Sequence, residues 1–515
     1  MRSESVNAKN YTIVNPDSEK QALLLSSDQE SLQVPNGASG DSKSVDSFAD
    51  EVGVNRFHYI LICIMGLANV GDATEVISMG YIIASESFAT EFGDDITGKE
   101  TLTAAIFFGM LLGGIGVGVV GERIGRKRLL LATLAINSFA GCAAAATPDL
   151  VILTVLRAIA GVGVGGTVPC LFTLGAELTP ASKRGLFLTI IGWFWMVGSV
   201  STSILSILIM DYLKLSWRWF SLACVIPSAV CFFLVFRFVE ESPRYLVVIK
   251  KYDSAAAVLN RIAKCGQGEK SLLAITGEEI RGSVHERSDA SLNAGYVSQI
   301  KSIYLHKKLR KSTLVLQALW FFLSFSNYGL ITWITTLFKT IGLANYDVAS
   351  SCFALGALPG NLVSTYLIEK TGRRPLMIWS MALGAISLVL FAVLVKNSPQ
   401  NHTGLIILSG AAYNACATAS WNTLDVMSAE TSPTTVRTTV MGILSASGRI
   451  GAMLAQFTNA ALVKSPALLL SLASAIMLFG AIAPLALPDM KGRALQDHFG
   501  GNNGGKNSDE EDGTL

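Results

Sequence analysis

The chain has 515 residues, of which 51% are hydrophobic and only 15% are charged. Soluble domains usually carry about 25% charged residues, so the composition excludes an ordinary soluble protein. The net charge of +2 is too small to indicate a nucleic acid or another strongly charged partner.

The N-terminal segment is polar and contains no apolar core. We therefore expect a disordered tail over residues 1–55 and a first span that is its own targeting signal. Within this tail, Glu19, Leu23 and Leu24 have the spacing of an acidic dileucine signal, which would bind a sorting adaptor. Disordered composition alone produces the same pattern, so both interpretations stay open.

Twelve apolar runs follow, each close to the length that a helix needs to cross a bilayer. They lie near residues 57–84, 101–120, 128–147, 150–173, 185–210, 217–239, 312–340, 346–368, 374–395, 403–425, 437–462 and 466–487. The predicted fold class is an all-α membrane protein with twelve transmembrane helices.

The runs divide into two sets of six. We expect one bundle over residues 56–245 and another over 312–490, joined by a loop over 246–311 and followed by a disordered tail over 491–515. Apolar residues at helical spacing between Lys250 and Lys264 predict a surface helix within that loop.

Basic residues cluster in the connections after the second, fourth, eighth and tenth runs. The positive-inside rule places these connections, the 246–311 loop and both termini in the cytoplasm. The basic residues are Arg123, Arg126, Lys127, Arg128, Lys183, Arg184, Lys370, Arg373, Arg374 and Arg437. On the other side, Asn401 begins a glycosylation sequon whose occupancy is left open.

The two halves repeat each other. Residues 122–127 (Glu-Arg-Ile-Gly-Arg-Lys) recur as residues 369–374 (Glu-Lys-Thr-Gly-Arg-Arg). The pattern Glu-x-x-Pro-x-x-x-Arg of residues 177–184 recurs at residues 430–437. Parallel repeats of this kind place a binding site between the halves near the bilayer midplane.

Two acids stand in the middle of the first run. Asp72 and Glu75 are three residues apart and so share one helix face. A charged carboxylate at the bilayer centre costs on the order of 3 kcal/mol, and such residues normally face a bundle interior or an aqueous cavity. We predict a pair that accepts a proton or binds a cation; a hydrogen-bonded structural acid is the alternative.

The tenth and eleventh runs carry further candidates for a binding site. Trp421 and Asp425 share a helix face, and an aromatic ring beside an acid suits a cation or a polyol ring, although Trp421 could instead be an interfacial tryptophan. Arg449, far from both ends of its run, needs an anion, either Asp425 or a substrate carboxylate. The other candidates for this site are Trp195, Asn327, Tyr328 and Asn422.

Charged residues at the basic connections form a second group. We expect ion pairs there that hold the two bundles in one state and break in the other, which is a gating role. The candidates are Glu122, Arg126, Glu177, Arg184, Glu369, Arg373, Glu430 and Arg437. No catalytic residue, metal or cofactor is expected, because the cysteines lack metal-ligand spacing and no P-loop or hydrolase motif occurs.

These motifs resemble the major facilitator superfamily. Residues 121–128 resemble its loop between the second and third helices. Arg157 with the glycines of 161–166 resembles its fourth-helix motif, which implies a gating role for Arg157. Residues 241–244 resemble the motif after the sixth helix of sugar and organic-cation porters, with Glu240 in place of the first proline.

A narrower resemblance is to the synaptic vesicle glycoprotein 2 family and its related-protein branch. It rests on residues 72–75, 194–198 and 421–426. It implies cavity positions for Trp195, Tyr328, Trp421 and Asp425. The vesicle glycoproteins carry a large lumenal domain between helices seven and eight, whereas here the connection spans only residues 341–346, so any function of that domain is absent.

We therefore expect a secondary carrier that works by rocking of two bundles, in the plasma membrane or an endosomal or secretory vesicle membrane. Its partners would be the lipid bilayer and a small polar organic solute, with a cation as one option and a proton as the coupling ion. A sugar porter is the rival, but the paired glutamines of sugar porters are missing and Gln317 stands alone. A non-transporting receptor or vesicle-trafficking protein is the other alternative.

Overall fold

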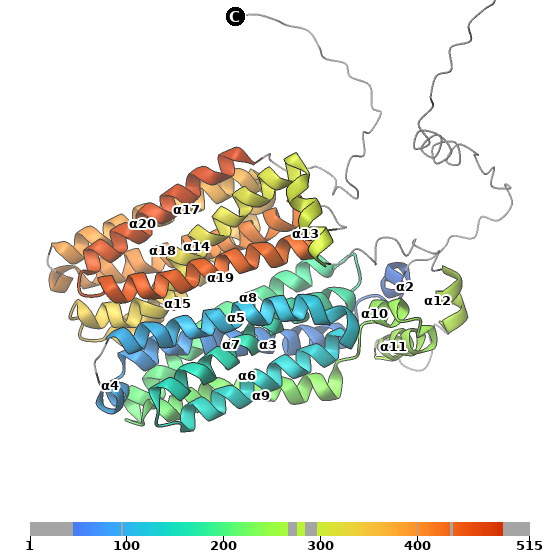
Figure 1. The fold of residues 1–515 in the computed structure, drawn as a ribbon, viewed down its shortest axis with the longest axis horizontal. Coiled ribbons are helices and arrows are strands. Elements are labelled where there is room, and N and C mark those ends of the chain that lie inside the picture. The colour runs from blue at the N-terminus through green and yellow to red at the C-terminus, as the bar shows by residue number, and fades with distance from the viewer. Residues whose placement is uncertain are drawn as a thin grey trace, which may run out of the picture. The chain divides into compact units, whose positions relative to one another are not determined.

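The computed structural model describes residues 45–93, 96–265, 275–283, 296–397, 399–432 and 436–487. All of these belong to one compact unit, Lys43–Leu515, whose described part is built from helices (Figure 1). The two expected tails lie outside the described residues, apart from the stretch from residue 45 onward, and so does the Glu19, Leu23 and Leu24 pattern.

The helices of the N-terminal bundle begin at Arg56 and end at Phe238. They are α3 (Arg56–Ala84), α5 (Ile96–Ile124), α6 (Arg126–Ala146), α7 (Leu150–Glu177), α8 (Arg184–Ser206) with its continuation η1 (Ile207–Tyr212), and α9 (Trp217–Phe238). A short helix, α4 (Glu86–Phe92), follows α3.

The helices of the C-terminal bundle begin at Lys307. They are α14 (Lys307–Thr340), α15 (Tyr346–Leu355) with α16 (Ala357–Thr371), α17 (Arg373–Lys396), α18 (Thr403–Thr431), α19 (Arg437–Leu462), and α20 (Pro466–Ile482) with η3 (Ala483–Ala486). The sequence placed the start of this bundle at residue 312. The helix begins earlier because its first turn, from Lys307, is polar and adds nothing to the apolar run.

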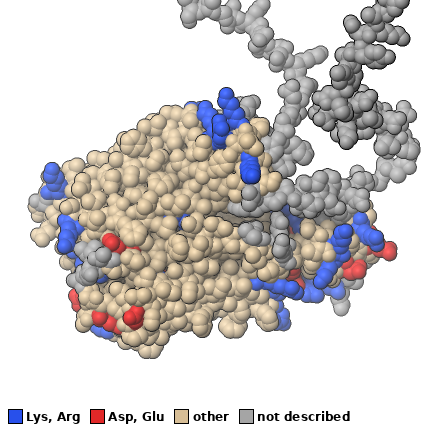
Figure 2. Space-filling view, in the orientation of Figure 1, with Lys and Arg blue, Asp and Glu red and all other residues tan. Residues whose placement is uncertain are grey.

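Eleven spans within the described residues are long and apolar enough to cross a membrane. The helix that completes the predicted twelve is α18, which has 29 residues but carries many polar side chains, among them Asn414, Asn422 and Asp425. It nevertheless packs among the other spans, against α16 and α17. Figure 2 shows that Lys, Arg, Asp and Glu gather toward the ends of the molecule and leave the middle of this face almost uncharged, as a membrane-spanning protein requires.

The sequence repeat is also a repeat of backbone geometry. Gly125 separates α5 from α6 with φ of 100°, and Gly372 separates α16 from α17 with φ of 91°. Both values lie in the region that favours glycine, so the same sharp turn is made at equivalent positions of the two halves. We call the end of the molecule with these turns, and with the loops after α7 and α18, the basic end; the other is the opposite end.

Short helices lie at the basic end. They are α2 (Val45–Val52), α10 (Pro243–Val248), α11 (Tyr252–Lys264), α12 (Gly277–Ser283) and α13 (Tyr296–Leu305). The expected surface helix between Lys250 and Lys264 corresponds to α11, which buries its apolar stripe against α2, α10 and α12. The side chain of Asn55 donates a hydrogen bond of 2.9 Å to the carbonyl of Ile262, which ties the start of α3 to α11.

Glycines let α5 and α7 touch along their backbones. A methyl group added at Gly109 would collide with the carbonyl oxygen of Ala158, and one added at Gly161 would collide with that of Ile106. The same reciprocal contact recurs one turn further along. There Gly113 faces the carbonyl oxygen of Val162, and Gly165 faces that of Met110. No side chain therefore separates the two helices at these points.

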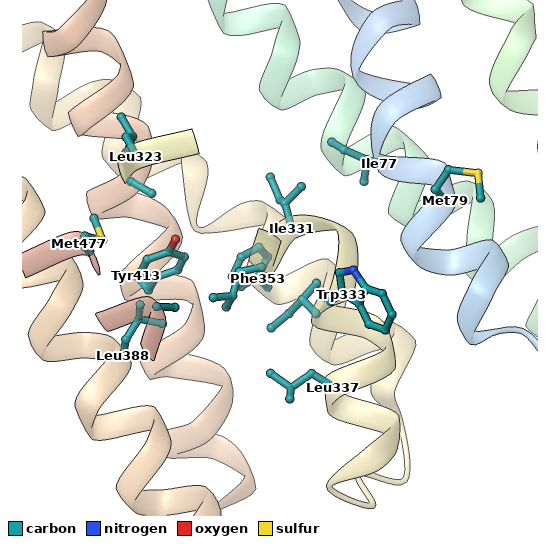
Figure 3. Close-up of a cluster of buried hydrophobic side chains, with 14 of the residues drawn as sticks. Ile77, Met79, Leu323, Ile331, Trp333, Leu337, Phe353, Leu388, Tyr413 and Met477 are labelled. Carbon is teal, nitrogen blue, oxygen red and sulfur yellow. The ribbon is translucent and has the colours of Figure 1, made fainter. Parts of the chain in front are cut away.

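The two bundles meet chiefly through three helix pairs, with a smaller contact between α8 and α16. α5 packs against α19, α3 against α14, and α8 against α15. Figure 3 shows part of the apolar contact, in which Ile77 of α3 is turned toward Ile331 of α14. The repeat predicts a binding site along this interface.

Candidate substrate and coupling site

Tyr328 of α14 is the centre of a group of aromatic side chains that joins the two bundles. Its ring centroid lies 5.3 Å from that of Phe107 on α5 and 6.4 Å from that of Trp195 on α8, both in the N-terminal bundle. In the C-terminal bundle it lies 5.7 Å from Trp421, which is 5.3 Å from Trp320. These edge-to-face contacts have the spacing that aromatic pairs prefer. We call these five residues the aromatic group.

Hydrogen bonds separate the roles of the two neighbouring residues of α18. The indole Nε1 of Trp421 donates to Oδ1 of Asn327 at 3.1 Å, so Asn327 fixes the orientation of the ring. Asn422 faces another helix, where its Nδ2 donates to Asn361 Oδ1 at 2.9 Å and to Ser364 Oγ at 2.8 Å. Asn422 therefore ties α18 to α16, while Trp421 belongs to the aromatic group.

Arg449 of α19 brings a positive charge to this group. Its guanidinium carbon lies 5.4 Å from the centroid of the Tyr328 ring, within the range of a cation–π interaction. No hydrogen bond or ion pair joins it to any residue that the structure describes. It forms no ion pair with either aspartate of the candidate site, Asp72 in the N-terminal bundle or Asp425 in the C-terminal bundle.

The two aspartates have opposite surroundings. Asp72 is fully buried, and neither carboxylate oxygen has a hydrogen-bond partner within the described part of the chain. Asp425 is exposed, although it is six residues, or about 9 Å, from the basic end of its helix. Arg449, Trp195 and Trp421 are also partly exposed. The solvent that reaches Asp425 therefore also reaches the edge of the aromatic group.

Glu75 differs from Asp72 because it has an ion-pair partner. It forms a buried ion pair of 2.5 Å with Arg157 of α7, whose second terminal nitrogen donates to Ser221 Oγ of α9 at 3.0 Å. The structure thus places Arg157 inside the N-terminal bundle, seven residues from the opposite end of α7, and not among the charges at the basic end. The shared helix face of Asp72 and Glu75 does not give them a shared environment.

The other gating candidates lie at the basic end, and the ion pairs shown there join residues of the same bundle. Arg126 pairs with Glu177 at 3.6 Å. Arg373 pairs with Glu430 at 2.9 Å and with Glu369 at 3.1 Å. The repeat therefore places equivalent arginine–glutamate pairs in both halves. Their gating role stays a prediction.

Two of the remaining gating candidates, Arg184 and Arg437, donate hydrogen bonds to backbone carbonyl groups. Arg184 donates from Nε to the carbonyl of Ala176 at 2.8 Å, and Arg437 donates to the carbonyl of Ser432 at 3.3 Å. Both arginines thus close the loop that precedes their own helix. The side chain of Glu122 lies outside the part of the chain that the structure describes.

Polar contacts close the opposite end between the two bundles. The hydroxyl groups of Ser203 on α8 and Ser351 on α15 touch, and Ser206 donates to Asp347 Oδ1 at 3.4 Å. Lys339 of α14 donates to the carbonyl of Ala84 on α3 at 2.8 Å. We call these contacts the opposite-end seal.

Sequence reasoning missed several residues that support the site. Phe107 completes the aromatic group, Ser221 holds Arg157, and the pair Asn361 and Ser364 holds Asn422. A signal existed for Asn361, because a polar amide in the middle of an apolar run needs a partner. No signal marks Phe107 or Ser221, since phenylalanine and serine are common in membrane helices.

The fold and the sequence similarity to known proteins indicate the same class of protein. Residues 72–498 match the model of the family described as "Sugar (and other) transporter". The chain therefore belongs to this family, within the major facilitator superfamily, and the resemblance drawn from its loop motifs is confirmed.

The chain is similar to curated proteins of the synaptic vesicle and organic cation transporter groups. Synaptic vesicle 2-related protein of Rattus norvegicus is 28% identical over 484 residues, covering 89% of this chain and 83% of the relative. Organic cation/carnitine transporter 7 of Arabidopsis thaliana is 26% identical over 463 residues, covering 83% and 90%. Synaptic vesicle glycoprotein 2C of Mus musculus is 24% identical over 592 residues, covering 86% and 80%.

A solved structure shows the same fold. The inward open conformation of the xylose transporter XylE from E. coli aligns with a TM-score of 0.67 and 18% identity, over 85% of this chain and 98% of that chain. At this identity the likeness shows the fold of two bundles and says nothing of the substrate.

Proposed function

We propose that the chain is a secondary active transporter of a small polar organic solute, exposing its central site to the two sides of the membrane in turn. The observation that carries this proposal is a set of charges and rings within the spans, drawn from both bundles, with Asp72 and Arg449 near the middle of their helices. Asp72, Asp425 and Arg449 would be costly there without a ligand or a coupling ion. The aromatic group supplies flat surfaces for the solute.

The contacts between the bundles fit one state of such a cycle. The opposite-end seal joins the bundles, whereas the ion pairs Arg126–Glu177 and Arg373–Glu430 each stay within one bundle. The exposed Asp425 lies toward the basic end. These features support a state that is closed at the opposite end and open toward the basic end.

Asp72 is the better candidate for the coupling proton. Glu75 already has the charge of Arg157 as its partner, whereas Asp72 is buried without a hydrogen bond to any described residue. A buried carboxylate that lacks a partner is stable only when it is neutral. Binding and release of a proton at Asp72 would therefore accompany the change of access.

A reversible cross-link at the opposite-end seal tests the proposal. Ser203→Cys with Ser351→Cys places two thiols where hydroxyl groups now touch, so oxidation should join α8 to α15. We expect the oxidised double variant to lose more than about 90% of its solute exchange in proteoliposomes, a tenfold loss. A reductant should restore the exchange. The solute would come from a binding screen of sugars, amines, amino acids and carboxylates.

Each single-cysteine variant is the control and should exchange solute normally under the same oxidation. Full exchange by the cross-linked protein, with the cross-link verified by a mobility shift, would show that the opposite end does not open. Alternating access would then be wrong for this chain.

We further propose that the basic end faces the cytoplasm and that the protein lies in a vesicle membrane. The basic loops support the orientation, and the names of the synaptic vesicle relatives support the membrane. Tags added to both ends should react with antibodies in intact cells only after the plasma membrane is permeabilised. A tag on the far side of the membrane at either end contradicts this topology.

A further inference from the structure

Two opposite charges beside the aromatic group have no ion-pair or hydrogen-bond partner among the described residues. Arg449 has no ion pair or hydrogen bond within the described residues, and Asp425 has an exposed side chain with no hydrogen bond there. The separation between them exceeds the 4.0 Å of an ion pair, since no such pair joins them. Yet Arg449 lies over Tyr328, Tyr328 contacts Trp421, and Trp421 shares a helix face with Asp425, so both charges border the same aromatic group.

Each of these charges needs a counter-charge when the site closes around a solute. Closing removes water, and a desolvated charge without a partner is strongly unfavourable. A purely cationic solute would satisfy Asp425 and leave Arg449 unpaired. A purely anionic solute would satisfy Arg449 and leave Asp425 unpaired, and an uncharged sugar would leave both.

We propose that the solute is a zwitterion, with its anionic group bound by Arg449 and its cationic group held beside Asp425. This inference rests on the proposed function and adds the substrate class. A guanidinium binds a carboxylate through two parallel hydrogen bonds, which suits Arg449 to the anionic end.

The helix geometry sets the direction of the solute. Trp421 precedes Asp425 by one turn of α18, so their side chains lie on one face about 6 Å apart. Trp421 contacts Tyr328, and Tyr328 contacts Arg449. The anionic end therefore lies deeper, at Tyr328, and the cationic end lies nearer the basic end, with the ring of Trp421 between them.

The aromatic group suits the cationic end as well. Arg449 lies over the face of Tyr328, which shows that this group accepts a cation. Aromatic faces bind quaternary ammonium groups through cation–π attraction. Methylation of the solute nitrogen should therefore keep or improve binding.

A charge-matched series of ligands tests the class. The zwitterions are glycine, β-alanine and γ-aminobutyrate with their N-trimethyl forms, which separate the two charges by different spacers. Each is compared with its methyl ester, which is only a cation, and with acetate, propionate or butyrate, which are only anions. Binding is measured as the thermal shift of the purified full chain, and exchange as counterflow in proteoliposomes.

We expect at least one zwitterion to bind about tenfold more tightly than its ester and its alkanoate, which is about 1.4 kcal/mol. In Arg449→Gln the zwitterion and its ester should bind within about twofold of each other, and in Asp425→Asn the zwitterion and its alkanoate should do so. Arg449→Lys should keep part of the preference, because the charge remains. Thr458→Val, on a part of α19 whose hydroxyl bonds only its own helix, should behave as the wild type.

The unfolding temperature without ligand shows that each variant is folded. If an ester, an alkanoate or a sugar binds the wild type at least as tightly as every zwitterion, the zwitterion class is overturned, and counterflow of that solute leaves the proposed transport function standing. If no solute of any class exchanges, the transport function itself fails. The ligand swap of the two variants distinguishes a direct role of each charge from a loss of folding.

Discussion

Arg157→Ala should destabilise the protein by about 3–5 kcal/mol, the usual cost of breaking a buried ion pair by removing one partner. The substitution leaves the carboxylate of Glu75 buried without its counter-charge and removes the hydrogen bond to Ser221. We expect a large fall in the unfolding temperature of the purified protein, measured by tryptophan fluorescence or by loss of helical circular dichroism.

Arg449→Ala is the matched control, because it also removes an arginine from the middle of a span but breaks no ion pair. Its unfolding temperature should change little. The double variant Glu75→Gln with Arg157→Gln should recover much of the stability lost by Arg157→Ala, since no unpaired charge remains. Equal effects of Arg157→Ala and Arg449→Ala would contradict the structural role of the Glu75–Arg157 pair.

Asp72→Asn should abolish uptake driven by a pH gradient, a loss of at least about 100-fold, which corresponds to about 2.7 kcal/mol. Asparagine imitates the protonated acid permanently, so the site can no longer take up and release a proton. Exchange of solute across the membrane, which needs no net proton movement, should survive. The measurement is uptake into proteoliposomes with and without an imposed pH gradient, beside counterflow without one.

Glu75→Gln provides the comparison. Because Glu75 is bound to Arg157, this substitution should lower the stability of the protein and should not separate driven uptake from exchange. Asp72→Asn should leave stability unchanged or raise it, since it removes a buried acid that has no hydrogen-bond partner in the described part of the chain. Full gradient-driven uptake by Asp72→Asn would remove the acid from the coupling mechanism.

Much of the fold could be predicted from the sequence, because membrane spans are recognised by the length and hydropathy of their apolar runs. The helix α18 shows that even a polar span can be recognised, because residues 403–425 still form an apolar run although Asn414, Asn422 and Asp425 lower its hydropathy. The start of α14 was misplaced by five residues, because a helix can extend beyond the apolar part of its sequence.

The candidate site could be predicted only in part. Helical spacing placed Asp72 and Glu75 on one face, but it could not show that Arg157, 82 residues further on, would neutralise one acid and leave the other alone. Likewise, the fourth-helix motif identified Arg157 without fixing its depth in the bundle. Such pairings depend on how helices rotate against one another, which local spacing does not contain.

The same limit applies to the aromatic group. Trp195, Tyr328 and Trp421 were candidates one by one, but their sequence positions could not show that Tyr328 contacts rings from both bundles. Asn422 stood beside Trp421 in the sequence, yet neighbouring residues of a helix point about 100° apart, and it bonds to α16.

The backbone contact between α5 and α7 has a mechanical consequence. Helices that touch at Gly109 and Gly161 have no side chains between them that could rearrange and absorb a displacement. We therefore expect a displacement of α5 by α19 to move α7, which carries Arg157, by a similar distance. The buried ion pair of one bundle should then respond to the position of the other bundle.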